Sequence, residues 1–256
     1  MPTSRDRERE RARRRLVKRQ ASQTERTGRR RRNQQIIGAV VTVLVVVLGV
    51  AALSRMVDPE TPAAAGPCPA APSAPSDVAT FASAPPRTLA EGKVWDASVV
   101  TSCGTIGFEL YGDKAPQTVS SFIYLAREGF YDDSPCHRLT TSESLKVLQC
   151  GDPTGQGTGG PGYTYGVENV PADGAYPAGT LAMARAESPD SNGSQFFITH
   201  GDSTLPTDGG GYSVFGKVTQ GLDVLATIAA GGTTNGSPDG PPTRSVSIES
   251  ITVTPR

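Results

Sequence analysis

Alternation of apolar and polar residues marks the chain from about residue 89 to residue 256. Between residues 105 and 110, Ile106, Phe108 and Leu110 fall on one face, and small or polar residues fall on the other. A period of two residues is typical of a half-buried β-strand. Similar short runs, separated by segments rich in glycine and proline, predict further strands at residues 95–100, 180–183, 195–199, 212–218 and 246–253.

Helical spacing of apolar residues occurs in two segments of the same region. Residues 115–128 have Pro116 in the first turn and Gly129 directly after the end, both of which favour a helix with these bounds. Residues 221–230 also carry apolar residues at helical intervals. Many strands with two helices predict a mostly-β fold, a closed β-barrel with helical caps.

An uninterrupted apolar segment covers residues 36–53, eighteen positions without a charge. At ~1.5 Å per helical residue it spans roughly 27 Å, close to a bilayer core, which predicts a transmembrane helix. A cleavable signal peptide is the alternative, because small residues such as Ala51 and Ala52 end the run, although signal sequences have shorter apolar cores. The arginines before the segment predict a single-pass membrane protein with a cytoplasmic N-terminus and an extracytoplasmic remainder.

Charge is distributed unevenly, although Lys+Arg 25 balances Asp+Glu 25. Residues 1–35 contain fourteen basic and four acidic residues, a net charge of +10, which leaves −10 for residues 36–256. This asymmetry excludes a soluble enzyme whose charge is distributed evenly along the chain. We expect the basic tail at residues 1–35 to contact anionic lipid headgroups, since it has no aromatic residues that would favour nucleic acid.

A segment rich in proline and alanine at residues 54–88 predicts an extended, largely disordered linker, because it has too few apolar side chains to offset the entropy of ordering. The expected organisation is therefore a tail at residues 1–35, a transmembrane helix at 36–53, this linker, and a globular domain at 89–256. No signal for oligomerisation stands out, and we expect a monomer.

Four cysteines and two histidines offer several kinds of chemistry. Cys103, Cys136, His137 and Cys150 lack the paired spacing of a zinc site. We favour a disulfide between Cys136 and Cys150, with Cys103 buried or paired with Cys68, while other pairings stay open. The position of Cys68 within the linker, taken alone, favours a free or intermolecular thiol.

Two further motifs have simpler interpretations. Residues 155–160 match G-x-G-x-x-G, but Pro161 follows in place of a helix, so a structural glycine loop is the better interpretation. Ser194 lacks the G-x-S-x-G frame of a serine hydrolase.

Several motifs then occur in one characteristic order. They are CHRL at residues 136–139, LQCGDPTG at 148–155, GTLAMA at 179–184, NGSQFFI at 192–198 and VFGKV at 214–218. The region from about residue 94 to 253 closely resembles the cyclophilin family of peptidyl-prolyl cis/trans isomerases. The resemblance implies an eight-stranded antiparallel β-barrel closed by two α-helices. It implies proline-containing polypeptides as partners and no metal or organic cofactor.

The resemblance also assigns roles to individual residues. Arg138 is the implied catalytic residue, whose guanidinium donates toward the prolyl nitrogen of the twisted amide. Gln149 would orient the carbonyl of the residue before proline. Phe197 matches the floor of an apolar cup for the proline ring, and Gln195 lies two residues away on the same strand face.

Departures from the family pattern affect the rest of the predicted substrate site. Ala184 and Arg185 match an Ala-Asn pair whose backbone holds the peptide. The segment before Gln149 is three residues longer than usual, so Val147 replaces a methionine and Leu145 or Lys146 replaces a phenylalanine. Leu205 and Tyr212 stand where a tryptophan and a histidine are familiar. These changes predict a shallower pocket, lower turnover and weak cyclosporin binding.

The sequence thus predicts a membrane-anchored isomerase that acts on exported proteins outside the cytoplasm. The alternative is a binding module or chaperone that uses the same groove for proline-containing segments, with a vestigial catalytic site. In a third interpretation the basic tail is the functional part and the barrel is a passive cap.

Overall fold

The structure is a computed structural model that describes residues 68–69 and 71–256. The predicted basic tail and the predicted transmembrane helix at residues 36–53 lie outside this part of the chain, as does the first part of the predicted linker. Within the described part, no helix combines the length and the apolar character needed to cross a membrane.

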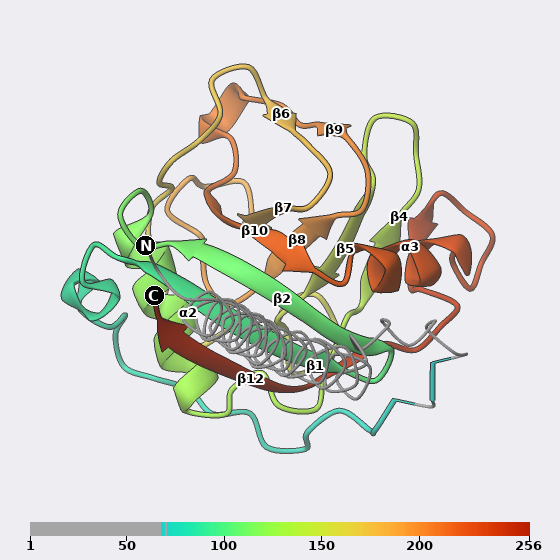
Figure 1. Cartoon of the computed structure of the whole chain (residues 1–256), viewed down its shortest axis with the longest axis horizontal. Helices are drawn as coiled ribbons and strands as arrows, with labels where there is room; N and C mark the ends of the chain where they lie inside the picture. Colours follow the sequence, from blue (N-terminus) through green and yellow to red (C-terminus); the bar gives the residue numbers. More distant parts are fainter. Residues whose placement is uncertain (1–67, 70) are drawn as a thin grey trace, which may run out of the picture. The chain divides into compact units, whose positions relative to one another are not determined.

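The sequence-predicted strands and helices agree closely with the observed elements (Figure 1). The helical elements are η1 (Arg87–Ala90), α2 (Pro116–Arg127), η2 (Asp208–Gly210) and α3 (Leu222–Ala230). The strands are β1 (Val94–Thr101), β2 (Gly104–Tyr111), β3 (Ser134–Pro135), β4 (Arg138–Thr140), β5 (Val147–Cys150), β6 (Ala175–Tyr176), β7 (Thr180–Met183), β8 (Phe196–Thr199), β9 (Ser203–Thr204), β10 (Val214–Gln220), β11 (Asp239–Gly240) and β12 (Ser247–Pro255).

The main sheet corrects the predicted closed, eight-stranded barrel. It has ten antiparallel strands in the order β11-β4-β5-β8-β7-β10-β2-β1-β12-β3, and its two end strands are not paired with each other. The sheet is therefore a curled, open half-barrel (Figure 1). Both end strands have only two residues, and Pro135 in β3 has no backbone N–H to donate to a further strand. Alternation in the sequence predicts strands, but it carries no information on whether the sheet edges meet.

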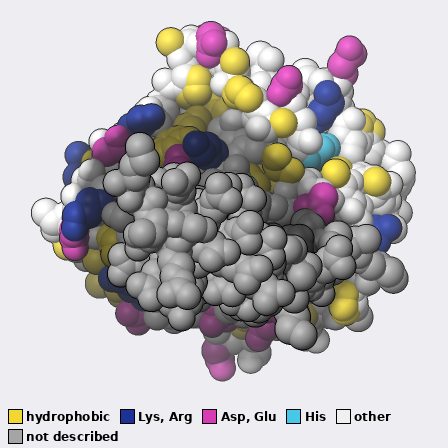
Figure 2. Space-filling view, viewed as in Figure 1, with side chains coloured by type: hydrophobic (Ala, Val, Ile, Leu, Met, Phe, Trp, Pro, Cys, Tyr) yellow, Lys and Arg dark blue, Asp and Glu magenta, His cyan; other side chains and the backbone are white. Residues whose placement is uncertain are grey.

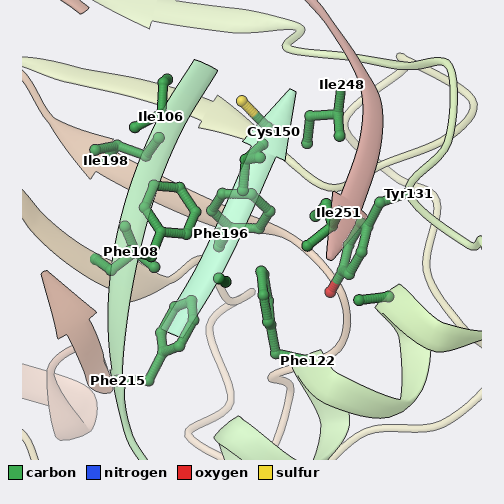
Figure 3. Packing of buried hydrophobic residues seen from close by; sticks show 14 of the residues in the cluster. Ile106, Phe108, Phe122, Tyr131, Cys150, Phe196, Ile198, Phe215, Ile248 and Ile251 are labelled. Atoms are coloured by element: carbon green, nitrogen blue, oxygen red, sulfur yellow. The ribbon is translucent and has the colours of Figure 1, made fainter. Parts of the chain in front are cut away.

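Aromatic rings fill the space between the sheet and α2. Phe122 from the helix packs against Phe196 and Phe215, with ring centroids 5.7 Å and 5.5 Å away (Figure 3). Phe108 of β2 lies 6.4 Å from Phe196. All four side chains are buried, and burial of each stabilises the fold by about 1.5–3 kcal/mol.

Two rows of residues cross the neighbouring strands β4, β5, β8 and β7. The first row belongs to the core cluster and consists of Leu139, Leu148, Ile198 and Leu181. The second row, one position along each strand, consists of Arg138, Gln149, Phe197 and Ala182. Because successive residues of a strand point to opposite faces, the second row faces away from the core. We call it the outer row.

Part of the segment expected to be a disordered linker is packed on the domain. Phe81 lies edge-on against Tyr124 of α2, with ring centroids 5.0 Å apart, and its backbone N–H donates to the carbonyl of Pro161 at 2.8 Å. Cys68 forms a disulfide with Cys103 in the turn between β1 and β2. Val78, Phe81 and other apolar residues of this strap, residues 78–90, contribute buried surface that a count of prolines overlooks.

Candidate active site

Arg138 and Gln149 begin the outer row as a directly opposed cross-strand pair on β4 and β5. The Nη1 of Arg138 donates to the Oε1 of Gln149 at 3.2 Å. A disulfide joins Cys136 to Cys150, the pairing preferred from the sequence. This covalent link lies two residues before Arg138 and one residue after Gln149, so both strands are held together where the two polar side chains meet.

Asp239 of β11 forms a bidentate ion pair with Arg138. The Nε and Nη2 of Arg138 donate to the two carboxylate oxygens at 2.8 Å and 2.7 Å. The hydrogen bond with Asp239 raises the pKa of Arg138, and the same contact lowers the pKa of the Asp239 carboxyl. Asp239 was missed from the sequence, since it lies 101 positions beyond Arg138 in a segment without a motif.

A chain of amides continues from Gln149 into the glycine loop. The Nε2 of Gln149 donates to the Oε1 of Gln195 at 2.9 Å, and the Nε2 of Gln195 donates to the carbonyls of Gly157 and Gly159 at 3.0 Å and 2.9 Å. These contacts fix the orientation of both amide groups. The structure thus brings Arg138, Gln149 and Gln195 together, and it gives residues 155–160 a structural role.

Asp152 stabilises the glycine loop through hydrogen bonds to its backbone. Its fully buried carboxylate accepts hydrogen bonds from the backbone N–H groups of Gly159 and Thr154 at 2.9 Å and 2.8 Å. Burial alone raises the pKa of this carboxyl, but these hydrogen bonds outweigh burial and lower it overall. The charged carboxylate therefore stabilises the loop that receives Gln195.

An apolar cup surrounds Phe197, the third member of the outer row. Phe197 is buried in a cluster that is separate from the main core and also contains Val147, Tyr176, Ala182 and Leu205, with Leu145, Ala184 and Tyr212 packed against it. The ring centroids of Tyr212 and Tyr176 lie 5.9 Å and 6.2 Å from that of Phe197. Tyr176 was missed from the sequence. Leu145, and not Lys146, joins the cup, because the aliphatic part of Lys146 packs beside Gly201.

Arg185 packs over the ring of Tyr212, which lies against the cup. Its guanidinium carbon lies 4.9 Å from the centroid of the Tyr212 ring, a cation–π contact. The Nε of Arg185 donates to the carbonyl of Gly211 at 2.6 Å, and Nη1 donates to the carbonyls of Ala186 and Glu187 at 2.9 Å. The backbone N–H of Ala184 donates to the carbonyl of Gln195 at 2.9 Å. Arg185 is thus held by the loops that form the cup.

A cleft of about 790 Å³ adjoins the cup. It shares Gln149, Ala184, Arg185 and Gln195 with the residues described above and is otherwise lined mainly by residues 157–164, with Ala186, Ser191, Gly193 and Ser194. Neither Phe197 nor Leu205 lines it, so the cup and the cleft are neighbouring features. On the described surface shown in Figure 2, small groups of hydrophobic side chains lie among basic, acidic and neutral ones.

His137 lies between the disulfide-bonded Cys136 and Arg138 in the sequence. Both of its ring nitrogens are buried without a hydrogen-bond partner, and burial lowers the pKa of the imidazole. Cys103, Cys136 and Cys150, which were considered with His137 as zinc ligands, are all in disulfides. Among the described residues, no group of three or more His, Cys, Asp or Glu side chains is arranged to hold a metal ion.

The fold and site together define a mostly-β protein in which an arginine on the outer row lies beside an aromatic cup and an adjoining cleft. The sequence profile described as "Cyclophilin type peptidyl-prolyl cis-trans isomerase/CLD" matches residues 97–253. The chain belongs to this family.

Curated relatives and solved structures agree with that assignment. The chain is 47% identical over 168 residues to a "Probable peptidyl-prolyl cis-trans isomerase B" of Mycobacterium leprae, an alignment that covers 60% of this chain and 55% of the relative. It is 46% identical over 126 residues to "Peptidyl-prolyl cis-trans isomerase B" of Bacillus subtilis, covering 49% of this chain and 84% of the relative. The chain thus spans about half the length of the mycobacterial relatives it matches.

A crystal structure of a Cryptosporidium parvum cyclophilin-type peptidyl-prolyl cis-trans isomerase is 29% identical, with a TM-score of 0.53, and covers 63% of this chain and 98% of that chain. The same protein was also crystallised in the presence of the dipeptide Ala-Pro. That structure has 31% sequence identity to this chain and a TM-score of 0.53, and the match covers 62% of this chain and 98% of the crystallised chain.

Proposed function

We propose that the domain catalyses cis/trans isomerisation of X-Pro peptide bonds, with Arg138 as the catalytic residue. The observation that carries this proposal is the outer row, because Arg138, Gln149 and Phe197 stand side by side on three paired strands and face away from the core. A proline ring seated against Phe197 would bring its peptide nitrogen towards the guanidinium of Arg138.

The chemistry requires no covalent bond to break. Rotation about the peptide bond is slow because resonance stiffens C–N, with a barrier of ~18–20 kcal/mol. In the twisted transition state the prolyl nitrogen recovers its lone pair and becomes a hydrogen-bond acceptor. A guanidinium that is always charged and already oriented stabilises this state without a general base. Gln149 has one amide N–H bonded to Gln195, and we propose that its second N–H orients the carbonyl of the residue before proline.

The proposal is tested by NMR exchange measurements on a short Ala-Pro peptide in the presence of the full-length chain. We expect faster exchange between the cis and trans forms, and a roughly 100-fold loss of this acceleration in Arg138→Ala. Arg87→Ala provides a matched control, since Arg87 is an exposed arginine of η1. Unchanged acceleration in Arg138→Ala would contradict the assigned mechanism.

A binding module with a vestigial catalytic site is a second candidate function. One observation favours it, since the Asp239 carboxylate occupies two donors of Arg138 and offsets part of its charge. The same peptide separates the two candidates. Saturable chemical-shift changes without faster exchange would assign the domain to binding and not to catalysis.

We also propose that the domain acts on exported polypeptides outside the cytoplasm, attached to the membrane through its N-terminal region. Two disulfides support this location, because such bonds persist in oxidising compartments. The sequence of residues 1–53 supports attachment and contact with anionic lipids. Protease added to intact spheroplasts should degrade the domain, and full protection from protease would overturn the proposed location.

A further inference from the structure

We propose that Asp239 is a positioning residue that aims the guanidinium of Arg138 at the substrate, an inference that rests on the proposed function. Asp239 pairs with Thr140 across β11 and β4, which makes Arg138 its diagonal neighbour on the same face. The long arginine side chain spans this diagonal. It meets the carboxylate through two parallel hydrogen bonds, the geometry with the highest directional specificity for arginine.

The segment around β11 that carries Asp239 is held by several hydrogen bonds. On one side, the backbone N–H of Thr141 donates to the carbonyl of Pro238 at 2.8 Å. On the other, the backbone N–H of Thr234 donates to the carbonyl of Pro241 at 2.9 Å. Just before β11, the Asn235 side chain accepts from the backbone N–H of Ser237 at 3.0 Å. The carboxylate is therefore presented from a fixed backbone, even though about half of its side chain is exposed.

The pairing leaves a defined set of donors for the substrate. A guanidinium has five N–H groups. Asp239 takes the Nε–H and one N–H of Nη2, and Gln149 takes one N–H of Nη1. One N–H of Nη1 and one of Nη2 remain, on the end of the guanidinium that is not occupied by Asp239. Two different partners thus hold the guanidinium plane, and its remaining edge is the part that can donate to the prolyl nitrogen.

This arrangement predicts a specific kinetic effect. Without Asp239, Gln149 alone constrains the guanidinium, which can then rotate away from the reacting nitrogen. The loss should therefore appear in the transition state and not in the binding of the peptide, so that kcat falls while KM stays constant. A purely structural contact between β11 and β4 would instead change the thermal stability and leave kcat unaltered.

The experiment measures kcat and KM for an Ala-Pro peptide with full-length Asp239→Ala, Asp239→Glu, Arg138→Ala and wild type. Glu249→Ala serves as the control, since Glu249 is an exposed carboxylate on β12. We expect about a tenfold lower kcat in Asp239→Ala with KM changed less than about twofold. Asp239→Glu keeps the charge and both oxygens and should recover most of the lost kcat.

An NMR signal gives a readout that is independent of activity. The Arg138 Nε–H should be protected from exchange with water in the wild type and lose that protection in Asp239→Ala. Wild-type or higher kcat in Asp239→Ala, together with an impaired Arg138→Ala, would overturn the role of Asp239 and leave the proposed function intact. Equal rates in Arg138→Ala and wild type would overturn both.

Discussion

Arg138 and Gln149 lie directly opposite each other on β4 and β5, and the Nη1 of Arg138 donates to the Oε1 of Gln149 at 3.2 Å. Gln149 is in turn oriented by Gln195. Replacing Gln149 with leucine keeps the side-chain size but removes both contacts. We expect kcat/KM for an Ala-Pro peptide to fall about tenfold in NMR exchange measurements, because the guanidinium loses one of its two partners. Gln220→Leu, at an exposed glutamine of β10, should have wild-type activity.

The two disulfides should have separable effects. Removing Cys136–Cys150 by a double alanine substitution should lower the free energy of unfolding by about 3 kcal/mol, the value for a closed loop of similar length. It should also lower kcat, because the linked strands carry Arg138 and Gln149. Removing Cys68–Cys103 should lower stability alone. Denaturant unfolding and peptide kinetics on both variants test this, and equal kcat in the two would contradict it.

Acidification should destabilise the protein through His137. Burial lowers the pKa of this imidazole in the folded state, so below its ordinary pKa of about 6.5 the unfolded chain takes up a proton more readily than the folded one. Stability is therefore fully present above this pH and decreases as the pH falls towards the lowered folded pKa. Asp152 opposes this shift and Arg138 adds to it.

Thermal unfolding at pH 7.5 and pH 5.5 provides the measurement. The difference in Tm between the two pH values should shrink in His137→Gln. The other histidine of the chain provides the matched control, so the difference should persist in His200→Gln. Equal pH dependence in wild type and His137→Gln would show that other groups are responsible.

The strap should stabilise the domain and should also help to set the shape of the cleft. Phe81→Ala removes an edge-on contact with Tyr124 and a partly buried ring, so we expect a loss of roughly 2 kcal/mol in the free energy of unfolding. Phe81→Leu retains apolar volume and should lose less. Because the backbone N–H of Phe81 donates a hydrogen bond to the carbonyl of Pro161, the amide resonances of Gly162 and Tyr163 should shift in Phe81→Ala. Unperturbed resonances would limit the strap to a stabilising role.

Local pattern predicted the elements, and the family resemblance named the candidate site residues. The alternation at residues 105–110 and the helix signals at residues 115–128 lie within β2 and around α2, because period and capping are properties of neighbouring residues. The resemblance named Arg138, Gln149 and Phe197, which the register then places in one row.

Features that depend on distant parts of the chain were not predictable in this way. Asp239 reaches Arg138 only through the β11–β4 pairing, and Tyr176 joins the cup through contacts with Phe197 and Tyr212. The open sheet was missed for the same reason, since edge pairing depends on how far the sheet curls. Phe81 was hidden among prolines and alanines, although its ring packs against Tyr124 and helps to hold the strap on the domain.

The Cys68–Cys103 disulfide determines where a mechanical load would enter the domain. A pull applied to the chain before Cys68 passes through the sulfur atoms to the turn between β1 and β2, and residues 69–102 lie inside the covalent loop. Tension therefore bypasses the strap and does not peel Phe81 from Tyr124 or from the carbonyl of Pro161. A load applied before Cys68 would therefore reach the sheet without passing through the contact between Phe81 and the loop that lines the cleft.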